Sequence, residues 1–120
     1  MTRRILIVDQ NPNYREILKA LLEKRGYMVT ALEDGFQIGS TLESEAFDII
    51  FLDSETAGIR GKALFAKIKK ECPHSYVILI TSKRGNGFIK EAMDHGAYGC
   101  IDKPFNPDEV LTMVNHLIRS

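Results

Sequence analysis

The chain has no tryptophan, only two cysteines and no excess of charge of either sign. The two cysteines show no CxxC spacing, so they indicate neither a disulfide framework nor a zinc site, and we expect a reduced, cytoplasmic setting. Lysine plus arginine number 16 and aspartate plus glutamate number 16, which gives a formal net charge of zero. Because nucleic acids and anionic membranes attract proteins with a basic excess, this balance argues against both as the main partner.

Long hydrophobic runs are also missing. The longest, at residues 5–8, 49–52 and 77–80, have four residues each, far fewer than the roughly 20 that cross a membrane. The basic start of the chain resembles the opening of a signal peptide, but Asp9 interrupts the apolar run too early for one. With 120 residues, of which 44% are hydrophobic, the chain is predicted to form one soluble domain over residues 1–120.

Short apolar runs alternate with amphipathic stretches along the chain. This pattern predicts strands at 5–8, 27–32, 47–52, 76–80 and 98–101, and helices at 12–25, 36–45, 62–71, 86–95 and 107–118. The first helix has an N-cap at Asn11 and an apolar stripe formed by Ile17, Leu18, Leu21 and Leu22. Since alternating strands and helices need right-handed crossovers, we expect an α/β fold with a five-stranded parallel sheet covered on both faces.

Four polar side chains are predicted at the carboxyl ends of strands. Asp9 follows the first strand and Asp53 ends the third, while Thr81 ends the fourth strand and Lys103 follows the fifth. The functional crevice of a doubly wound parallel sheet lies at this edge. Two carboxylates, a hydroxyl and a lysine together suit a divalent cation such as Mg²⁺ and a phosphoryl group, because Mg²⁺ prefers carboxylate oxygens and the other two bind phosphoryl oxygens.

Four segments are similar to the signatures of one family. They are Ile5-Leu6-Ile7-Val8-Asp9-Gln10-Asn11-Pro12, Asp48-Ile49-Ile50-Phe51-Leu52-Asp53, Ile80-Thr81-Ser82 and Lys103-Pro104-Phe105. In this order, over essentially the whole chain, they resemble the receiver domain of two-component response regulators, of the chemotaxis single-domain type. The resemblance implies a doubly wound, flavodoxin-like sheet with strand order 2-1-3-4-5.

The resemblance also implies a role for each of the four side chains. Asp53 is expected to take a phosphoryl group from a histidine kinase or a phosphotransfer protein, and Asp9 and Asp53 to hold Mg²⁺. Thr81 and Lys103 are expected to bind the phosphoryl group, and Thr81 is expected to carry the switch into the fourth and fifth strands. A downstream protein is expected to dock on the fourth helix, fifth strand and fifth helix, with no direct contact to nucleic acid or membrane. Such a domain is a signalling phosphoacceptor that assists its own phosphoryl transfer and hydrolysis, not an enzyme.

The sequence departs from the family pattern at the metal site. Gln10 stands where the family has a second acidic ligand, so the loss of a full charge is expected to weaken Mg²⁺ binding. Glu55 lies two residues after Asp53, where the family supplies a backbone carbonyl ligand. We hypothesise that the Glu55 side chain partly replaces the lost charge; the alternative is that it faces solvent.

Two further departures affect the switch. Thr56-Ala57 replaces the family's methionine–proline pair, and Cys100 replaces its switch aromatic. Tyr98, two residues earlier on the same face of the strand, is the candidate for a displaced aromatic signal. These departures favour one alternative function, a phosphorylation-independent interaction module of the same fold. A small flavin-binding or hydrolytic α/β protein is disfavoured, because residues 9–13 contain no glycine to cradle a phosphate.

Overall fold

The computed structural model describes residues 3–56, 58, 62–82 and 87–118, so the predicted departure at Ala57 lies outside the described residues. Within them, the strands are β1 (Arg4–Val8), β2 (Met28–Leu32), β3 (Ile49–Asp53), β4 (Tyr76–Thr81) and β5 (Gly99–Asp102). The helices are α1 (Pro12–Glu23), α2 (Ile38–Ser44), α3 (Lys62–Glu71), α4 (Phe88–Asp94) and α5 (Pro107–Ile118). All strand pairs are parallel, in the order β2-β1-β3-β4-β5. The predicted fold class and strand order are therefore confirmed.

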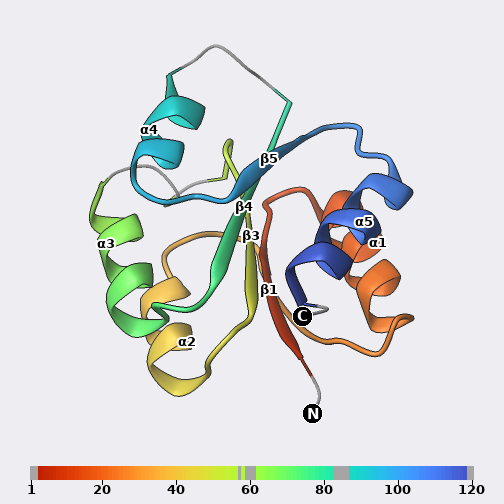
Figure 1. Cartoon of the computed structure of the whole chain (residues 1–120), viewed down its shortest axis with the longest axis horizontal. Coiled ribbons are helices and arrows are strands. Elements are labelled where there is room, and N and C mark those ends of the chain that lie inside the picture. Colours follow the sequence, from red (N-terminus) through yellow and green to blue (C-terminus); the bar gives the residue numbers. More distant parts are fainter. Residues whose placement is uncertain (1–2, 57, 59–61, 83–86, 119–120) are drawn as a thin grey trace.

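The sheet divides the hydrophobic core in two. Figure 1 shows α1 and α5 on one face of the sheet, and α2, α3 and α4 on the other. Because successive strand side chains point to opposite faces, Ile5 and Ile7 of β1 pack with α1 and α5, whereas Leu6 and Val8 pack with α2, α3 and α4. All five residues of β3 are buried. The side chains at the ends of β1 and β3 thus follow strands that are buried along almost their whole length.

Helix α1 begins at a polar cap beside the end of β1. Asn11 Oδ1 accepts hydrogen bonds from the backbone N–H groups of Asn13 (2.9 Å) and Tyr14 (3.2 Å). Its Leu18 and Leu22 are buried. Ile17, which was predicted in the same apolar stripe, is 53% exposed, so this part of the prediction is wrong. Each residue turns an α-helix by about 100°, so Ile17 lies outside the sector that faces the sheet.

Several predicted boundaries shift by one or two residues. Strand β3 begins at Ile49 rather than at residue 47. The Asp48 backbone still bonds to both neighbouring strands, since its N–H donates to the Arg4 carbonyl at 2.8 Å and its carbonyl accepts the Tyr76 N–H at 3.0 Å. The Asp48 Oδ2 also accepts the Arg4 N–H at 2.9 Å. Strand β5 begins one residue later than predicted, although the Tyr98 N–H still donates to the Val77 carbonyl at 2.7 Å. No helix among the described residues is long and apolar enough to span a membrane.

Candidate functional site

The four side chains predicted at strand ends lie at one edge of the sheet. Asp53 is the last residue of β3 and Thr81 the last of β4, while Asp9 and Lys103 directly follow β1 and β5. Asp9, Asp53 and Thr81 are each about 1% exposed. Since β1, β3, β4 and β5 are neighbours and parallel, their carboxyl ends bring these residues together.

Lys103 joins the two carboxylates. Its Nζ lies 2.9 Å from Asp9 Oδ2 and 3.2 Å from Asp53 Oδ1, and the Lys103 side chain is only 9% exposed. One ammonium group therefore compensates two buried carboxylates. This arrangement leaves an excess of negative charge, which favours a further cation at the site.

Asp9 is held by the loop that follows it. Its Oδ1 accepts the Asn11 N–H at 2.9 Å, and its backbone carbonyl accepts a hydrogen bond from the Arg15 guanidinium at 2.8 Å. Burial raises the pKa of Asp9 above its ordinary value of 3.8, and the nearby Asp53 charge acts in the same direction. The Asn11 N–H and the Lys103 ammonium oppose this rise in pKa. The protonation of Asp9 is therefore sensitive to any change in the charges around it.

A ring on α1 also contacts Lys103. The Lys103 Nζ lies 4.5 Å from the centroid of the Tyr14 ring, a distance at which the ring face attracts a cation. The Tyr14 and Phe105 rings are 5.7 Å apart, and the Lys103–Pro104 peptide bond is cis. Tyr14 was not among the predicted site residues, because nothing in the spacing of a helical tyrosine indicates which strand end it reaches.

Thr56 is a second site residue that the sequence interpretation missed. Its Oγ1 donates a hydrogen bond to Asp53 Oδ2 at 2.6 Å and accepts one from the Gln10 N–H at 2.9 Å. From the family pattern, Thr56 is only the replacement of a methionine. A hydroxyl residue in a turn, three positions after an acidic residue, is a weak signal for such a local bond.

Ser54 connects the end of β3 to the end of β4. Its backbone N–H donates to the Ile80 carbonyl at 2.9 Å, and its Oγ donates to Thr81 Oγ1 at 2.8 Å. Both hydroxyl groups belong to residues that are about 1% exposed. The predicted switch threonine is thus hydrogen-bonded directly to the residue that follows Asp53.

An open pocket lies over this cluster. The residues that line it are Gln10, Asn11, Tyr14, Asp53, Glu55, Ser82, Lys103 and Pro104. Asp53 Oδ1 is buried and accepts no hydrogen bond from the described residues, which leaves lone pairs for a cation or an electrophile.

The oxygens at this pocket suit Mg²⁺. Carboxylate, amide and backbone carbonyl oxygens are the hard donors that Mg²⁺ prefers, and Mg²⁺ keeps several waters. No group of three His, Cys, Asp or Glu side chains among the described residues is arranged to hold a metal. A cation here therefore needs ligands beyond Asp9 and Asp53. Glu55 is half-buried at the pocket wall, and its contribution of charge stays a prediction.

The two candidate switch positions lie away from the pocket, at the start of β5. Cys100 is half-buried and packs against the core on the side of α2, α3 and α4. Tyr98 is 41% exposed, and its ring meets the Tyr76 ring edge-on at 5.6 Å. An exposed aromatic residue is therefore present close to the position where the family pattern has one.

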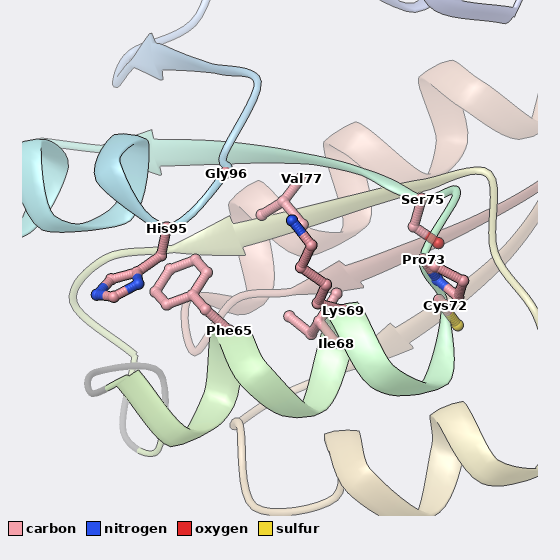
Figure 2. Close-up of a pocket in the computed structure, with 9 residues that line it drawn as sticks. All are labelled: Phe65, Ile68, Lys69, Cys72, Pro73, Ser75, Val77, His95 and Gly96. Atoms are coloured by element: carbon pink, nitrogen blue, oxygen red, sulfur yellow. The ribbon is translucent and has the colours of Figure 1, made fainter.

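A smaller pocket lies elsewhere, between α3 and the turn that joins α4 to β5. Figure 2 shows its lining, with the His95 and Phe65 rings side by side at one end and Cys72 at the other. The two rings stack with centroids 6.2 Å apart. None of the predicted site residues lines it, so the predicted chemistry belongs to the strand-end pocket.

Comparisons with known proteins bear on the family and the fold of the chain. The model of the response regulator receiver domain family matches residues 5–115. NtrC, a DNA-binding transcriptional regulator of Escherichia coli (strain K12), is 29% identical over 114 residues, which are 95% of this chain and 24% of NtrC. The chain thus spans about a quarter of the length of that relative.

Two solved structures have the same fold. A CheY-like response regulator receiver domain protein from Methanospirillum hungatei JF-1 is 27% identical with a TM-score of 0.89, and the match covers 97% of this chain and 93% of that one. The receiver domain of the sensor histidine kinase PA1611 from Pseudomonas aeruginosa PAO1 is 24% identical with a TM-score of 0.86, over 100% of both chains. That receiver holds a magnesium ion in its active-site cleft.

Proposed function

Because this chain belongs to the response regulator receiver domain family, we propose that it is a phosphorylation switch whose phosphoacceptor is Asp53. A histidine kinase or a phosphotransfer protein supplies the phosphoryl group. The observation that carries this proposal is the placement of Asp53 Oδ1, which lies at the end of β3, 3.2 Å from Lys103 Nζ and without a hydrogen bond from the described residues. That oxygen has lone pairs to offer to phosphorus.

The proposed transfer uses the residues around Asp53 in distinct ways. Asp53 Oδ1 forms a bond to phosphorus while the phosphorus–nitrogen bond of the donor phosphohistidine breaks, and the imidazole leaves with the electron pair. The Lys103 ammonium group then forms an ion pair with the negatively charged phosphoryl oxygens. Thr81 binds a phosphoryl oxygen through its hydroxyl and transmits the change into β4 and β5. The product is an aspartyl phosphate, so the chain acts as a signalling phosphoacceptor and not as an enzyme on other substrates.

We assign the Mg²⁺ site to the same pocket. Asp9 and Asp53 supply carboxylate oxygens, the Glu55 backbone supplies a carbonyl oxygen, and the Gln10 amide is a weaker fourth candidate. When bound, Mg²⁺ supplies positive charge against the phosphoryl oxygens. Because Gln10 carries no charge, we expect weaker Mg²⁺ binding than in a site with a third carboxylate at that position.

The output of the switch is a change in protein binding in the cytoplasm, with no direct contact to nucleic acid or membrane. We propose that a downstream protein docks on α4, β5 and α5, a face that includes the exposed Met93 and Tyr98. Tyr98 then takes the part of the switch aromatic, since Cys100 has no ring to move.

A second candidate function is a phosphorylation-independent interaction module. The hydrogen bond from Thr56 to Asp53 favours it, because it satisfies one carboxylate oxygen without any cation. In that case Asp53, Asp9 and Lys103 serve only to hold the strand ends together.

Phosphorylation by a small donor separates the two functions. The protein is incubated with Mg²⁺ and acetyl phosphate beside an Asp53→Asn control, and intact mass is measured. We expect one added phosphoryl group that depends on both Mg²⁺ and Asp53. The switch is contradicted if the folded protein gains no phosphoryl group and does not bind beryllofluoride, a phosphoryl mimic. That outcome supports the interaction module.

A further inference from the structure

The Thr56 hydroxyl is hydrogen-bonded on both sides. Its oxygen accepts the Gln10 backbone N–H at 2.9 Å and lies 2.6 Å from Asp53 Oδ2. A hydroxyl group has a single proton, and an N–H group can only donate. The proton of Thr56 is therefore directed at Asp53 Oδ2, and Thr56 is itself about 3% exposed.

This bond makes the two oxygens of Asp53 different. Oδ2 is held by Thr56, whereas Oδ1 faces Lys103 and accepts no hydrogen bond from the described residues. Oδ1 is consequently the oxygen that takes the phosphoryl group. In the resulting aspartyl phosphate, Oδ2 is the carbonyl oxygen, and it still faces the Thr56 hydroxyl.

We propose that Thr56 is a positioning residue that shortens the lifetime of the aspartyl phosphate, an inference that rests on the proposed function of Asp53. Thr56 acts through Asp53 and does not touch the phosphoryl group. Thr56 thereby has a kinetic role at a position where this sequence departs from the family's methionine.

The chemistry of hydrolysis explains the direction of the effect. A water oxygen forms a bond to phosphorus, the bond from phosphorus to Asp53 Oδ1 breaks, and the electron pair stays with the carboxylate. Both water protons remain on the released inorganic phosphate. The leaving carboxylate gains negative charge that is shared between Oδ1 and Oδ2. A donor at Oδ2 binds this charge more strongly than it binds the neutral carbonyl oxygen of the ester, so it lowers the barrier.

The test compares aspartyl phosphate decay in matched variants. Wild type, Thr56→Val, Thr56→Ser and Thr41→Val are loaded with acetyl phosphate and Mg²⁺, desalted, and followed by intact mass. Valine keeps the shape of threonine without the hydroxyl, and serine restores the hydroxyl. Thr41 is the matched control, because its hydroxyl donates to the Gln37 carbonyl at 2.8 Å on α2, away from the site. Thermal unfolding checks that each variant is folded.

We expect Thr56→Val to decay about tenfold more slowly than wild type, because it lacks one donor to a charged leaving group. Thr56→Ser and Thr41→Val are expected to decay at the wild-type rate. Decay of Thr56→Val at the wild-type rate overturns the inference, and so does slow decay of Thr56→Ser.

A spectroscopic measurement without any phosphoryl donor examines the hydrogen bond itself. The ¹³C resonance of the Asp53 carboxyl carbon should shift in Thr56→Val and return in Thr56→Ser. An unmoved resonance overturns the inference even where Asp53 accepts phosphate. Wild-type protein that accepts no phosphoryl group overturns the proposed function, and the lifetime role with it, whereas equal decay of wild type and Thr56→Val overturns the lifetime role alone.

Discussion

Replacing Lys103 with methionine tests how the strand-end cluster is held. The substitution keeps an unbranched chain of similar length but removes the ammonium group. In the native protein this group lies 2.9 Å from Asp9 Oδ2 and 3.2 Å from Asp53 Oδ1. Without it, two carboxylates that are each about 1% exposed face one another with no compensating charge.

The expected loss of stability is large for a single substitution. Removing one partner of a buried ion pair costs about 3–5 kcal/mol, because the remaining charge is left buried. The open pocket beside the cluster lets water approach, so we place the loss for Lys103→Met at about 3 kcal/mol at neutral pH in the absence of divalent cations. The exposed Lys90, which pairs with Asp94 on α4, provides the matched control. Lys90→Met should change the free energy of unfolding by less than about 1 kcal/mol.

The loss must also depend on pH in a defined direction. Burial already raises the pKa of Asp9 above 3.8, and Lys103 is one of the groups that limit the rise. A raised native pKa means that the native state binds more protons than the unfolded chain above pH 3.8, so stability falls as pH rises through this interval. Because Lys103 lowers the pKa of Asp9, Lys103→Met should raise this pKa further and extend the pH interval upward. Its deficit should be largest near neutral pH and should shrink as pH falls through 3.8, because below this value Asp9 becomes protonated in the unfolded chain as well as in the native state.

Urea unfolding in EDTA, followed by circular dichroism at a series of pH values, measures this deficit for Lys103→Met and Lys90→Met. A Lys103→Met protein as stable as wild type at neutral pH would refute the placement of Lys103 between the carboxylates. A deficit of constant size across the pH series would refute its electrostatic origin.

Five further substitutions test Asp9 and helix α1. Asp9→Asn removes a carboxyl whose pKa is raised by burial, so it should stabilise the cation-free protein at neutral pH. Urea unfolding measures this. A lower free energy of unfolding at neutral pH, or an increase that persists near pH 3.8, contradicts the prediction. Leu22→Ala should cost about 2–5 kcal/mol in thermal or urea unfolding, because Leu22 is fully buried. Ile17→Ala, at a 53% exposed position of the same helix, should cost less than about 1 kcal/mol, and equal losses would show that α1 faces the sheet differently. Asn11→Ala should lower stability by about 1 kcal/mol through loss of the helix cap, and Asn11→Asp should retain most of it.

The parts of this fold that follow from repeating patterns were predictable from the sequence. Apolar runs and amphipathic stretches alternate, so the parallel sheet and its two helical layers follow from periodicity and the handedness of crossovers. The edge that carries Asp9, Asp53, Thr81 and Lys103 follows as well, because parallel strands end on the same side. The strand order rested on the family resemblance and is confirmed.

The parts that depend on a single contact between distant residues were not predictable. Ser54 and Thr56 are short polar residues in a turn, and their partners Thr81 and Gln10 lie 27 and 46 positions away. Nothing in a local pattern indicates such a pairing. The hydrogen bond from the Arg4 N–H to the Asp48 side chain, 44 positions along the chain, is a further pairing of this kind.

The ring of Tyr14 beside Lys103 gives the protein a built-in optical reporter. The chain has four tyrosines and no tryptophan, so tyrosine emission is not lost by energy transfer to an indole. The Tyr14 ring centroid lies 4.5 Å from the Lys103 Nζ, and Tyr14 lines the strand-end pocket. Any displacement of the ammonium group changes the electric field across that ring. The fluorescence difference between wild type and Tyr14→Phe can therefore follow occupation of the site in real time, without an attached dye.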